Sequence, residues 1–440
     1  MNDVRPFGGR APSTGGVATA LLALAVLVSF CVSPMTLTAI GVSYDVVGGS
    51  PLLKIHPANW LFALALLVNW LGQQDLIGYL AAMARLFPGA MLFGAMWLLT
   101  VAYASLVQRL PATPLLDTYF AAIAALFLYE GVDERTRRNF ALLLHIMLFV
   151  NACIGVGEFL THSRLTPFVA AGAPVLHDYR STALFGHPLL NAGTSAGYAL
   201  MLFYGGDPAD RRFLKAGLIG VQLAALVAFG GRTAIVLLAV LMALGALPTL
   251  GGVVNGRRFD RRVGLGLVFA LPLLLGALTA VASGGLFDQF ADRFGDDKGS
   301  AQARLVIFDL FGQFSLEDIL FGPNQERLAS LQRTLGIEYG IENSWLGLIF
   351  QYGAIMTTFF VVGLLALLGD IMSRSRKYAI VPVIYFLILV SSSASISVKS
   401  FSFNQFVILM VVVFGRAVAA PAPARETART APALGLASRI

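Results

Sequence analysis

The segment 342–368 reads ENSWLGLIFQYGAIMTTFFVVGLLALL, and no charged residue lies between Ser344 and Leu368. A helix of about twenty apolar residues spans a hydrocarbon core roughly 30 Å thick. In lipid, every backbone N–H and C=O must be satisfied within the protein. An apolar run of this length therefore predicts a membrane-spanning helix and not a barrel strand.

Comparable runs recur along the whole chain, about twelve in all by the same length criterion. They fall near residues 17–40, 58–74, 88–109, 114–130, 139–160, 183–204, 212–230, 232–249, 263–284, 342–368, 378–397 and 401–419. The second run is short, and its exit at Gly72 to Asp75 is ambiguous. We expect an all-α polytopic membrane protein with about twelve transmembrane helices and one large periplasmic loop.

The composition agrees with this class. Of the 440 residues, 57% are hydrophobic and 12% are charged, whereas soluble domains carry roughly 25% charged residues. The net charge of +7 comes from Lys and Arg residues that cluster between the apolar runs, which is the topology signal of membrane helices and not the footprint of nucleic-acid binding. The two cysteines, Cys31 and Cys153, lie inside apolar runs and form neither a disulfide framework nor a metal-ligand spacing.

The basic clusters also predict the orientation. If all twelve runs span, every cluster falls on one side, which the positive-inside rule makes the cytoplasmic side. The clusters are Arg5 and Arg10, then Arg135, Arg137 and Arg138, then Arg211, Arg212 and Lys215, then Arg257, Arg258, Arg261 and Arg262, then Arg374, Arg376 and Lys377, and finally Arg425 and Arg429. Both termini are therefore expected in the cytoplasm, and the first run is expected to be a retained helix and not a cleaved signal peptide.

Two loops on the other side are long, over residues 161–182 and 285–341. The second is rich in acidic residues and contains apolar stretches such as Leu305–Phe314, so we expect it to fold into short helices on the membrane surface. The Ala- and Pro-rich tail 421–440 is expected to be disordered in the cytoplasm. Residues 1–440 then form a single polytopic domain.

Ionisable residues near membrane helices are costly and are default functional candidates. Arg232 lies in Phe229-Gly230-Gly231-Arg232-Thr233, where two apolar runs meet almost without a loop. The glycines allow a tight turn, and a guanidinium group matches phosphate oxygens. The alternative is an arginine that snorkels at a helix end. Arg304 opens the apolar stretch of the large loop; its alternative is a structural salt bridge to a nearby aspartate.

A third candidate is Glu342, which is expected to begin a helix, with Asn343 as a plausible N-cap. Gly353 lies eleven residues, about three helical turns, after Glu342 and so on the same face. It would let a neighbouring helix pack closely, leaving Glu342 partly desolvated at the mouth of a cavity, as a general base with a raised pKa. The alternative is an acidic residue that stabilises a helix N-terminus.

His187-Pro188 predicts the start of another helix on the same side, since proline favours the first turn. His187 could bind a sugar, shuttle a proton or serve the helix start structurally, and Arg180 could add a positive contact. The sequence has no P-loop, dinucleotide-binding fingerprint, His/Cys metal cluster or Gly-x-Ser-x-Gly elbow. His145 stands alone in its run and reads as a buried structural histidine.

Taken in order, the Gly-Gly-Arg-Thr junction, the later loop arginine and Glu-Asn followed by nine residues and Gly353 resemble the O-antigen ligase/polymerase superfamily of bacterial Wzy- and WaaL-type proteins. The resemblance is strongest over 183–368 and includes the Phe-Gly-His-Pro entry at His187. It implies a glycosyltransferase at the periplasmic face of the bacterial inner membrane. Its substrates would be glycan units linked to undecaprenyl pyrophosphate.

The branch of the superfamily stays open. The ligase branch has a His where this chain has Glu342, which favours a Wzy-type polysaccharide polymerase of O-antigen, capsule or exopolysaccharide over transfer to lipid A-core or protein. The polymerase Arg-x10-Gly pattern is not cleanly present either, because twelve residues separate Arg180 from Gly193. The resemblance also implies a chain-length regulator and a flippase of the same pathway as partners.

The expected chemistry follows from the leaving group, a lipid diphosphate that needs no nucleotide, cofactor or metal. Arg232 and Arg304 would stabilise the charge that develops on the departing phosphate. Glu342 would accept the proton of the attacking hydroxyl, with Asn343 and Trp345 as sugar contacts and Arg180 and His187 as further substrate contacts. The rival classes are a polysaccharide transporter or flippase, with ionisable groups near the midplane, and a scaffold subunit of an export complex.

Overall fold

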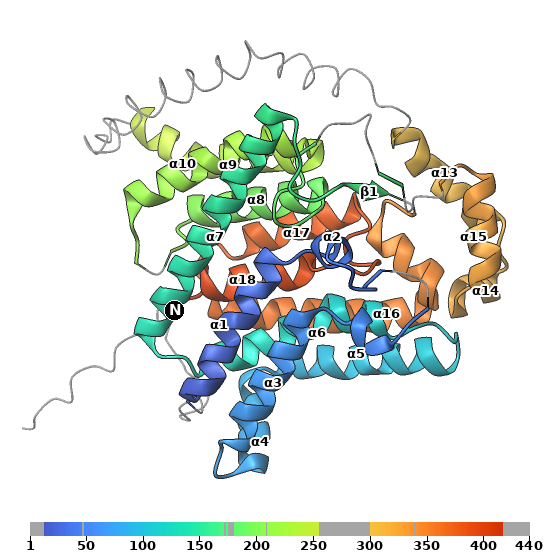
Figure 1. The fold of residues 1–440 in the computed structure, drawn as a ribbon, viewed down its shortest axis with the longest axis horizontal. Coiled ribbons are helices and arrows are strands. Elements are labelled where there is room, and N and C mark those ends of the chain that lie inside the picture. Colours follow the sequence, from blue (N-terminus) through green and yellow to red (C-terminus); the bar gives the residue numbers. More distant parts are fainter. Residues whose placement is uncertain are drawn as a thin grey trace, which may run out of the picture.

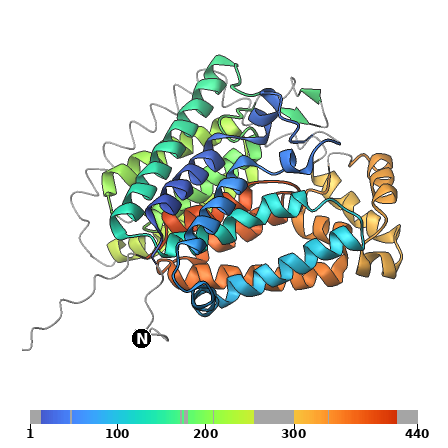
Figure 2. The ribbon, with the colours of Figure 1, turned by 60° about the horizontal axis from the view of Figure 1, so that its bottom comes forward.

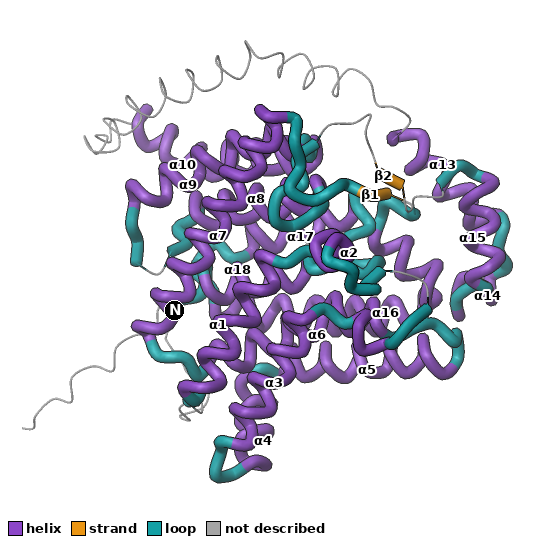
Figure 3. Tube along the Cα trace, viewed as in Figure 1, coloured by secondary structure: helices purple, strands orange, loops and turns teal. Residues whose placement is uncertain are grey.

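The computed structural model describes residues 13–45, 48–170, 173–174, 180–207, 209–254, 300–337 and 340–416. The apolar run predicted near 263–284 and the tail 421–440 lie outside these residues. The described chain is almost entirely helical, as predicted; Figure 3 shows its two short strands in the loop between α7 and α8.

The helices follow one another along the chain, joined mostly by short turns. Their bounds are α1 Gly16–Cys31, α2 Pro34–Ala39, the 3-10 helix η1 Pro51–Lys54, α3 Pro57–Leu71, α4 Leu76–Leu86, α5 Pro88–Leu106, α6 Thr113–Glu130, α7 Glu134–Thr161, α8 Pro188–Phe203, α9 Arg212–Phe229, α10 Arg232–Val254, α13 Ser300–Gly312, α14 Leu316–Phe321, α15 Gln325–Thr334, α16 Ser344–Arg374, α17 Ile380–Ser391 and α18 Ser402–Val412. The strands β1, Val169–Ala170, and β2, Ala173–Pro174, pair antiparallel.

Among the described residues, four helices (α5, α7, α9 and α16) are long and apolar enough to cross a bilayer, and α3 with α4 makes a fifth if that bent pair is one crossing. The helices α1, α10, α17 and α18 contribute shorter apolar segments. Many large apolar side chains face outward, including Leu98 on α5, which is 58% exposed. Outward-facing leucines on apolar helices are the arrangement of a membrane-embedded protein.

Two of the predicted runs are interrupted. The run 17–40 is not one helix, because α1 ends at Cys31 and Pro34 opens the short α2, whose first turn is capped by Ser33. Proline lacks the N–H that a helix interior requires, so the chain restarts there. The ambiguous end of the second run is a bend of 120° between α3 and α4. Asp75 caps α4, which projects away from the other helices in Figure 1.

The antiparallel helices α5 and α16 make the most extensive helix pair, and small residues let them approach closely. A Cβ atom at Gly89 would overlap the carbonyl group of Ala366, and one at Gly363 would lie 3.0 Å from the Cα atom of Phe93. Small residues at such crossings replace the hydrophobic driving force that lipid does not supply.

An aromatic cluster fills the space where α5, α6, α16 and α18 meet. Phe93, Tyr119, Phe360 and Phe403 are buried and contact one another edge to face or tilted, with the Tyr119 and Phe360 ring centroids 4.8 Å apart. The Tyr119 hydroxyl donates to the carbonyl oxygen of Ile396, before α18. Since a buried tyrosine needs a partner for its hydroxyl, this bond fixes the α17–α18 loop over the cluster.

Contacts between distant segments define two ends of the helix bundle. At the arginine-rich end, Arg374 pairs with Glu130, at 2.9 Å, and Arg211 pairs with Asp207, at 3.2 Å. The Arg376 guanidinium donates to the carbonyl oxygen of Asp207. Three of the predicted basic clusters, those at 135–138, 211–215 and 374–377, therefore lie at one end. The opposite end carries the starts of α3, α8, α10 and α16 and the loop from α7 to α8.

The helices α13, α14 and α15 form an outer segment beyond the ends of α5 and α16, as Figure 2 shows from a second side. It is folded, as predicted for the large loop. Ile307, Leu310 and Phe314 pack with Phe350 of α16. The loop after α14 enters a break in α16 at Gly353, where φ is 83° and ψ is 158°, and Tyr103 and Gln108 each donate a hydrogen bond to the carbonyl oxygen of Phe321.

Candidate functional site

A buried carboxylate holds the loop between α7 and α8. Glu158, in the last turn of α7, is 5% exposed. One of its oxygens accepts from the amide of Leu165, at 2.6 Å, and the other accepts from the amides of Thr182 and Ala183, at 2.8 and 2.9 Å. Because charge-assisted bonds of this kind are the stronger ones, Glu158 ties both ends of the loop to α7.

Asn151, two turns earlier on α7, extends the same attachment. Its side-chain oxygen accepts from the amide of Leu184, and its nitrogen donates to Asn191 on α8, at 2.9 Å. Asn191 in turn donates to the carbonyl oxygens of Thr182 and His187. The start of α8 is therefore fixed by fully buried amide side chains.

The loop held in this way presents two arginines around one ring. The guanidinium groups of Arg164 and Arg180 both lie 5.8 Å from the centre of the Phe168 ring. Arg164 donates to the carbonyl oxygen of Arg180, at 3.0 Å. His187 meets the same ring edge to face, with centroids 5.2 Å apart. Arg180 and His187 were predicted as substrate contacts, and the structure brings them together with Arg164 around Phe168.

His187 is the N-cap of α8, and Pro188 is the first residue of that helix, as predicted. The imidazole Nδ1 accepts from the amide of Leu189, at 3.2 Å. Burial, together with the nearby Arg180, lowers the pKa of His187 to about 4. The ring is therefore uncharged at neutral pH, and its structural role at the helix start, one of the predicted alternatives, is shown.

The predicted tight junction between two helices is present. α9 ends at Phe229, Gly230 adopts the left-handed conformation with φ 66°, and α10 begins at Arg232. A Cβ atom on Gly231 would overlap Ala192 of α8, so the turn packs directly on that helix. Arg232 is half-buried. The amide of Ser181 donates to the carbonyl oxygen of Ala228, which joins this junction to the loop that carries Arg180.

The start of α16 differs in part from the prediction. Asn343 is its N-cap and accepts from the amides of Trp345 and Leu346, at 3.0 and 3.2 Å, as expected. Glu342, however, precedes the helix and is exposed, so the expected partly desolvated position between helices is wrong. The shared face with Gly353 is wrong too, because the backbone at Gly353 is not helical and breaks the phase of α16.

Trp345 contacts the last residue of α17, and Ser344 contacts the serine-rich loop that follows this helix. The indole Nε1 of Trp345 donates to the hydroxyl of Ser391, at 2.7 Å. The Ser344 hydroxyl donates to the carbonyl oxygen of Ser393 and accepts from the amide of Ile396. An indole offers a sugar an apolar ring and a polar N–H, and a hydroxyl can both donate and accept a hydrogen bond. Both groups are therefore suited to sugar contacts.

Arg304 lies on α13, and its side chain is outside the described part of the structure. The following turns of α13 pack on α16, where the Phe311 and Phe350 rings are 4.8 Å apart. The other six predicted residues form two groups at the same end of the bundle. Arg180, His187 and Arg232 lie near the start of α8, whereas Glu342, Asn343 and Trp345 lie at the start of α16.

The helix α17 contacts both of the helices at whose starts these groups lie. Its last turn carries Ser391, which contacts Trp345. Two turns earlier, the Tyr385 hydroxyl donates to the carbonyl oxygen of Gly193 on α8, at 3.0 Å. A Cβ atom on Gly193 would lie 2.8 Å from the Leu389 side chain. The helix α17 therefore contacts both α8 and α16.

A further polar network at this end was missed by the sequence analysis. The fully buried Asp117 of α6 accepts from the Tyr44 hydroxyl, the His56 amide and the Asn59 side chain, at 2.6, 2.8 and 2.7 Å. Lys399 lies 3.7 Å from the same carboxylate. Burial lowers the pKa of Lys399, against the opposing effect of Asp117. The signal was available, since Asp117 and Lys399 are ionisable residues at or inside apolar runs.

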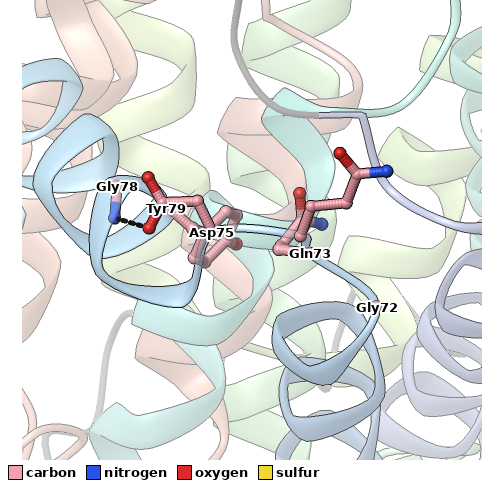
Figure 4. Close-up of a pocket in the computed structure, with 6 residues that line it drawn as sticks. Gly72, Gln73, Asp75, Gly78 and Tyr79 are labelled. Atoms are coloured by element: carbon pink, nitrogen blue, oxygen red, sulfur yellow. Dashed lines mark hydrogen bonds between the residues drawn. The ribbon is translucent and has the colours of Figure 1, made fainter.

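The bend between α3 and α4 contains a hollow of about 350 Å³ lined by six residues. Figure 4 shows Asp75 accepting from the amide of Gly78, next to Gln73 and Tyr79. This hollow is at the arginine-rich end, away from the predicted residues, and the Asp75 contact is an ordinary helix cap. Among the described residues, no group of three or more His, Cys, Asp or Glu side chains could hold a metal ion.

Comparison with known proteins does not assign the site. No protein-family model matches the sequence, and no curated protein matches it.

Proposed function

We propose that the protein is a polytopic glycosyltransferase of the bacterial inner membrane that joins glycan units carried on undecaprenyl pyrophosphate into a polysaccharide. In this proposal the chain crosses the bilayer about twelve times, and the arginine-rich end, with both termini, faces the cytoplasm. The positive-inside rule supports this orientation, which leaves the candidate residues at the periplasmic face.

One observation carries the proposal. Arg232 begins a helix, and the start of this helix packs against a second helix close to the start of that second helix. Arg232 is the first residue of α10, and Gly231 packs on Ala192, one turn into α8. A helix start carries a partial positive charge, so a cation is unfavourable there and an anion is favoured. Two helix starts with Arg232 and the nearby Arg180 loop therefore suit a dianionic leaving group such as a diphosphate.

The proposed reaction uses these groups without a cofactor. The oxygen of an acceptor hydroxyl attacks the anomeric carbon, and the bond from that carbon to the phosphate oxygen breaks. Undecaprenyl diphosphate leaves with the bonding electrons, stabilised by Arg232 and Arg304. The hydroxyl proton passes to Glu342, whose exposed carboxylate an acceptor can reach from solvent.

The transporter alternative draws on the buried ionisable residues inside the helices. His145 contacts the Tyr198 hydroxyl at 2.6 Å and Asp207 at 3.3 Å toward the arginine-rich end, whereas Asp117 lies toward the opposite end. Transporters place such groups together near the midplane. The separation of these two networks supports a structural role for each and leaves the enzyme as the better proposal.

The test uses purified protein in lipid nanodiscs with undecaprenyl-pyrophosphate-linked repeat units. We expect Arg232→Ala and Arg304→Ala each to lower the transfer rate by about 10²–10³-fold, and Glu342→Gln by about 10²-fold. Arg333→Ala and Glu317→Gln, at exposed positions of α15 and α14, are matched controls that should retain the wild-type rate. Wild-type transfer by all three site variants, or no transfer by the wild type, would contradict the proposal.

The branch is decided by the glycan of a deletion strain. Loss of polymer with single repeat units kept on lipid A supports the polymerase, which Glu342 favours. Loss of all long glycan from lipid A supports the ligase. Orientation is tested separately in a variant without Cys31 and Cys153, because Lys215→Cys should react with a thiol reagent only from the cytoplasm and Ser163→Cys only from the periplasm.

A further inference from the structure

A concave apolar surface lies between α16 and α17. This α16–α17 groove has a volume of about 420 Å³. Its lining consists of Trp345, Val361, Leu365, Ile384, Leu387, Ile388 and Ser391. Leu365, Ile384 and Ile388 are between 40% and 49% exposed, so these side chains line the groove without closing it.

The groove changes in polarity along its length. Its polar end is the hydrogen-bonded pair of Trp345 and Ser391, next to the helix cap Asn343. The rest of the lining is aliphatic. From Ser391 to Ile384 the groove follows α17 for roughly 10 Å, at 1.5 Å per residue. A ligand that matches this surface has a polar head at the Trp345 end and a hydrocarbon chain that runs from there along α17.

We propose that the α16–α17 groove holds the first part of the isoprenoid chain of the lipid-linked glycan, with its sugar and diphosphate beyond the Trp345–Ser391 end, toward the starts of α8 and α10. This inference rests on the proposed function. It commits to the substrate's own chain and not to a structural phospholipid, because the polar end of the groove belongs to the candidate site. A chain attached to a diphosphate bound beside α8 or α16 must leave the site through the membrane, and the groove is the aliphatic surface that begins there.

The effect of the groove on affinity is expected to be small. The chain moves from lipid, which is as apolar as the groove, so no hydrophobic gain accompanies binding, and only packing contacts are added. The groove therefore orients the anomeric carbon toward the acceptor more than it retains the substrate. We therefore expect substitutions in the groove to change KM moderately and to change which protein segments a photoreactive isoprenoid chain labels.

The first experiment labels the chain directly. An isoprenoid diphosphate with a photoreactive group near the head is irradiated with the full-length protein in nanodiscs, and the labelled peptides are identified by mass spectrometry. We expect labelling of the segments 361–365 and 384–388, in competition with unlabelled undecaprenyl diphosphate. Labelling spread over lipid-facing helices such as α5, without competition, would mean ordinary annular binding and would overturn the inference.

The second experiment fills the groove. Leu365→Trp and Ile388→Phe should reduce labelling at least threefold and raise KM for the long-chain substrate by about three- to tenfold, because the chain is displaced from its path. Transfer from an analogue with a chain too short to enter the groove should be unchanged. Leu98→Trp, on the lipid-facing surface of α5, is the matched control and should alter neither quantity.

The outcomes separate the two proposals. If glycan transfer occurs but the groove variants behave as the control, the groove is wrong and the proposed function stands. If the groove is labelled competitively but no glycan is transferred, the isoprenoid site stands and the proposed function is wrong. A loss of transfer from the short-chain analogue in Leu365→Trp would show general damage and would overturn the groove as the cause.

Discussion

At the two ends of the bundle, the helix termini are completed by different kinds of residue. At the arginine-rich end, guanidinium groups bind the carbonyl groups that a helix leaves unpaired. Arg137 donates to the carbonyl oxygens of Tyr129 and Glu130 at the end of α6, at 3.0 and 2.7 Å. Arg374 donates to Leu86 at the end of α4, and Arg416 to Ser375 after α16.

At the opposite end, α7 and α9 finish through left-handed residues instead, at His162 with φ 52° and Gly230 with φ 66°. Three of the helices that begin there are capped by uncharged side chains, namely α3 by His56, α8 by His187 and α16 by Asn343. Helix ends need donors at carbonyl groups and acceptors at amide groups. The arginines of the arginine-rich end therefore complete helix C-termini, whereas Arg232 lies at the start of a helix.

The sharpest test of this difference is the buried ion pair at the arginine-rich end. Asp207 is fully buried and contacts His145 and two nitrogens of Arg211. Asp207→Asn keeps the shape and tolerates the local φ of 80° but leaves the cation unpaired. Because Asp207 is buried but the Arg211 side chain is 36% exposed, we expect a loss of about 3 kcal/mol in the free energy of unfolding, measured by thermal or denaturant unfolding in detergent.

Two further variants serve as comparisons for the stability loss of Asp207→Asn. Asp210→Asn removes an exposed partner of Lys215 and should cost less than about 1 kcal/mol. Asp117→Asn, at the opposite end, keeps one acceptor oxygen for its neutral donors and leaves Lys399 paired with Asp45, so it should cost about 1–3 kcal/mol. Equal losses for Asp207→Asn and Asp117→Asn would remove the distinction between the two ends.

As the pH falls, interactions at the opposite end should lose their contribution to stability before those at the arginine-rich end. Burial lowers the pKa of His56 to about 4, with a smaller effect from Lys399 in the same direction, although the hydrogen bond to Val32 opposes it. Between about pH 6.5 and 4 the unfolded state binds a proton that the folded state does not, so stability falls as the pH falls, by up to about 3 kcal/mol. His187 acts in the same direction.

The arginine-rich end should respond only at lower pH. Burial would raise the pKa of Asp207, but hydrogen bonds from His145 and Arg211 hold it below its usual range, so its contribution is complete at pH 5 and is lost only on further acidification. The check is the unfolding midpoint at pH 7, 6 and 5. His56→Asn, which keeps an N-cap acceptor, should flatten this dependence, and an unchanged slope would contradict the assignment to His56.

Gly353→Ala tests how the outer segment is attached at the opposite end. A Cβ atom there would overlap the backbone of Leu320 and Phe321, and the φ of 83° is strained for alanine. We expect a loss of about 2 kcal/mol and faster proteolysis within residues 313–337. Gly369→Ala, on the same helix with open space around it, should be cleaved by the protease at the wild-type rate.

The smallest effect is expected for the helix cap. Asn343→Ala should lower stability by about 1 kcal/mol, whereas Asn343→Ser should restore most of it. Transfer activity separates capping from sugar contact, because a residue that only caps recovers activity in the serine variant together with stability. Activity lost equally in both variants would assign Asn343 to the substrate.

The sequence allowed the helical class to be predicted because long apolar runs have one solution in lipid. Local signals also predicted the Asn343 cap, the helix start at Pro188 and the turn at Gly230, since each depends on neighbouring residues. The break at Gly353 could not be predicted, because it depends on the approach of Gly322 from another segment. The Asp117 network was missed for the same reason, as Tyr44, Asn59 and Lys399 are far away in sequence.

The interruption of α16 separates a part that is long enough to span the membrane from a part that carries Trp345, one of the proposed sugar contacts. A continuous helix of 31 residues would measure roughly 46 Å, well beyond a hydrocarbon core of roughly 30 Å, whereas Ala354–Arg374 alone would measure roughly 32 Å. The part from Ser344 to Tyr352 therefore belongs mechanically with α13–α15, to which Phe350 joins it. A tilt of this joint unit about Gly353 would open the hydrogen bonds of Ser344 and Trp345 to the end of α17 and the loop after it, and it would move Asn343 relative to Arg232 without bending any segment embedded in lipid.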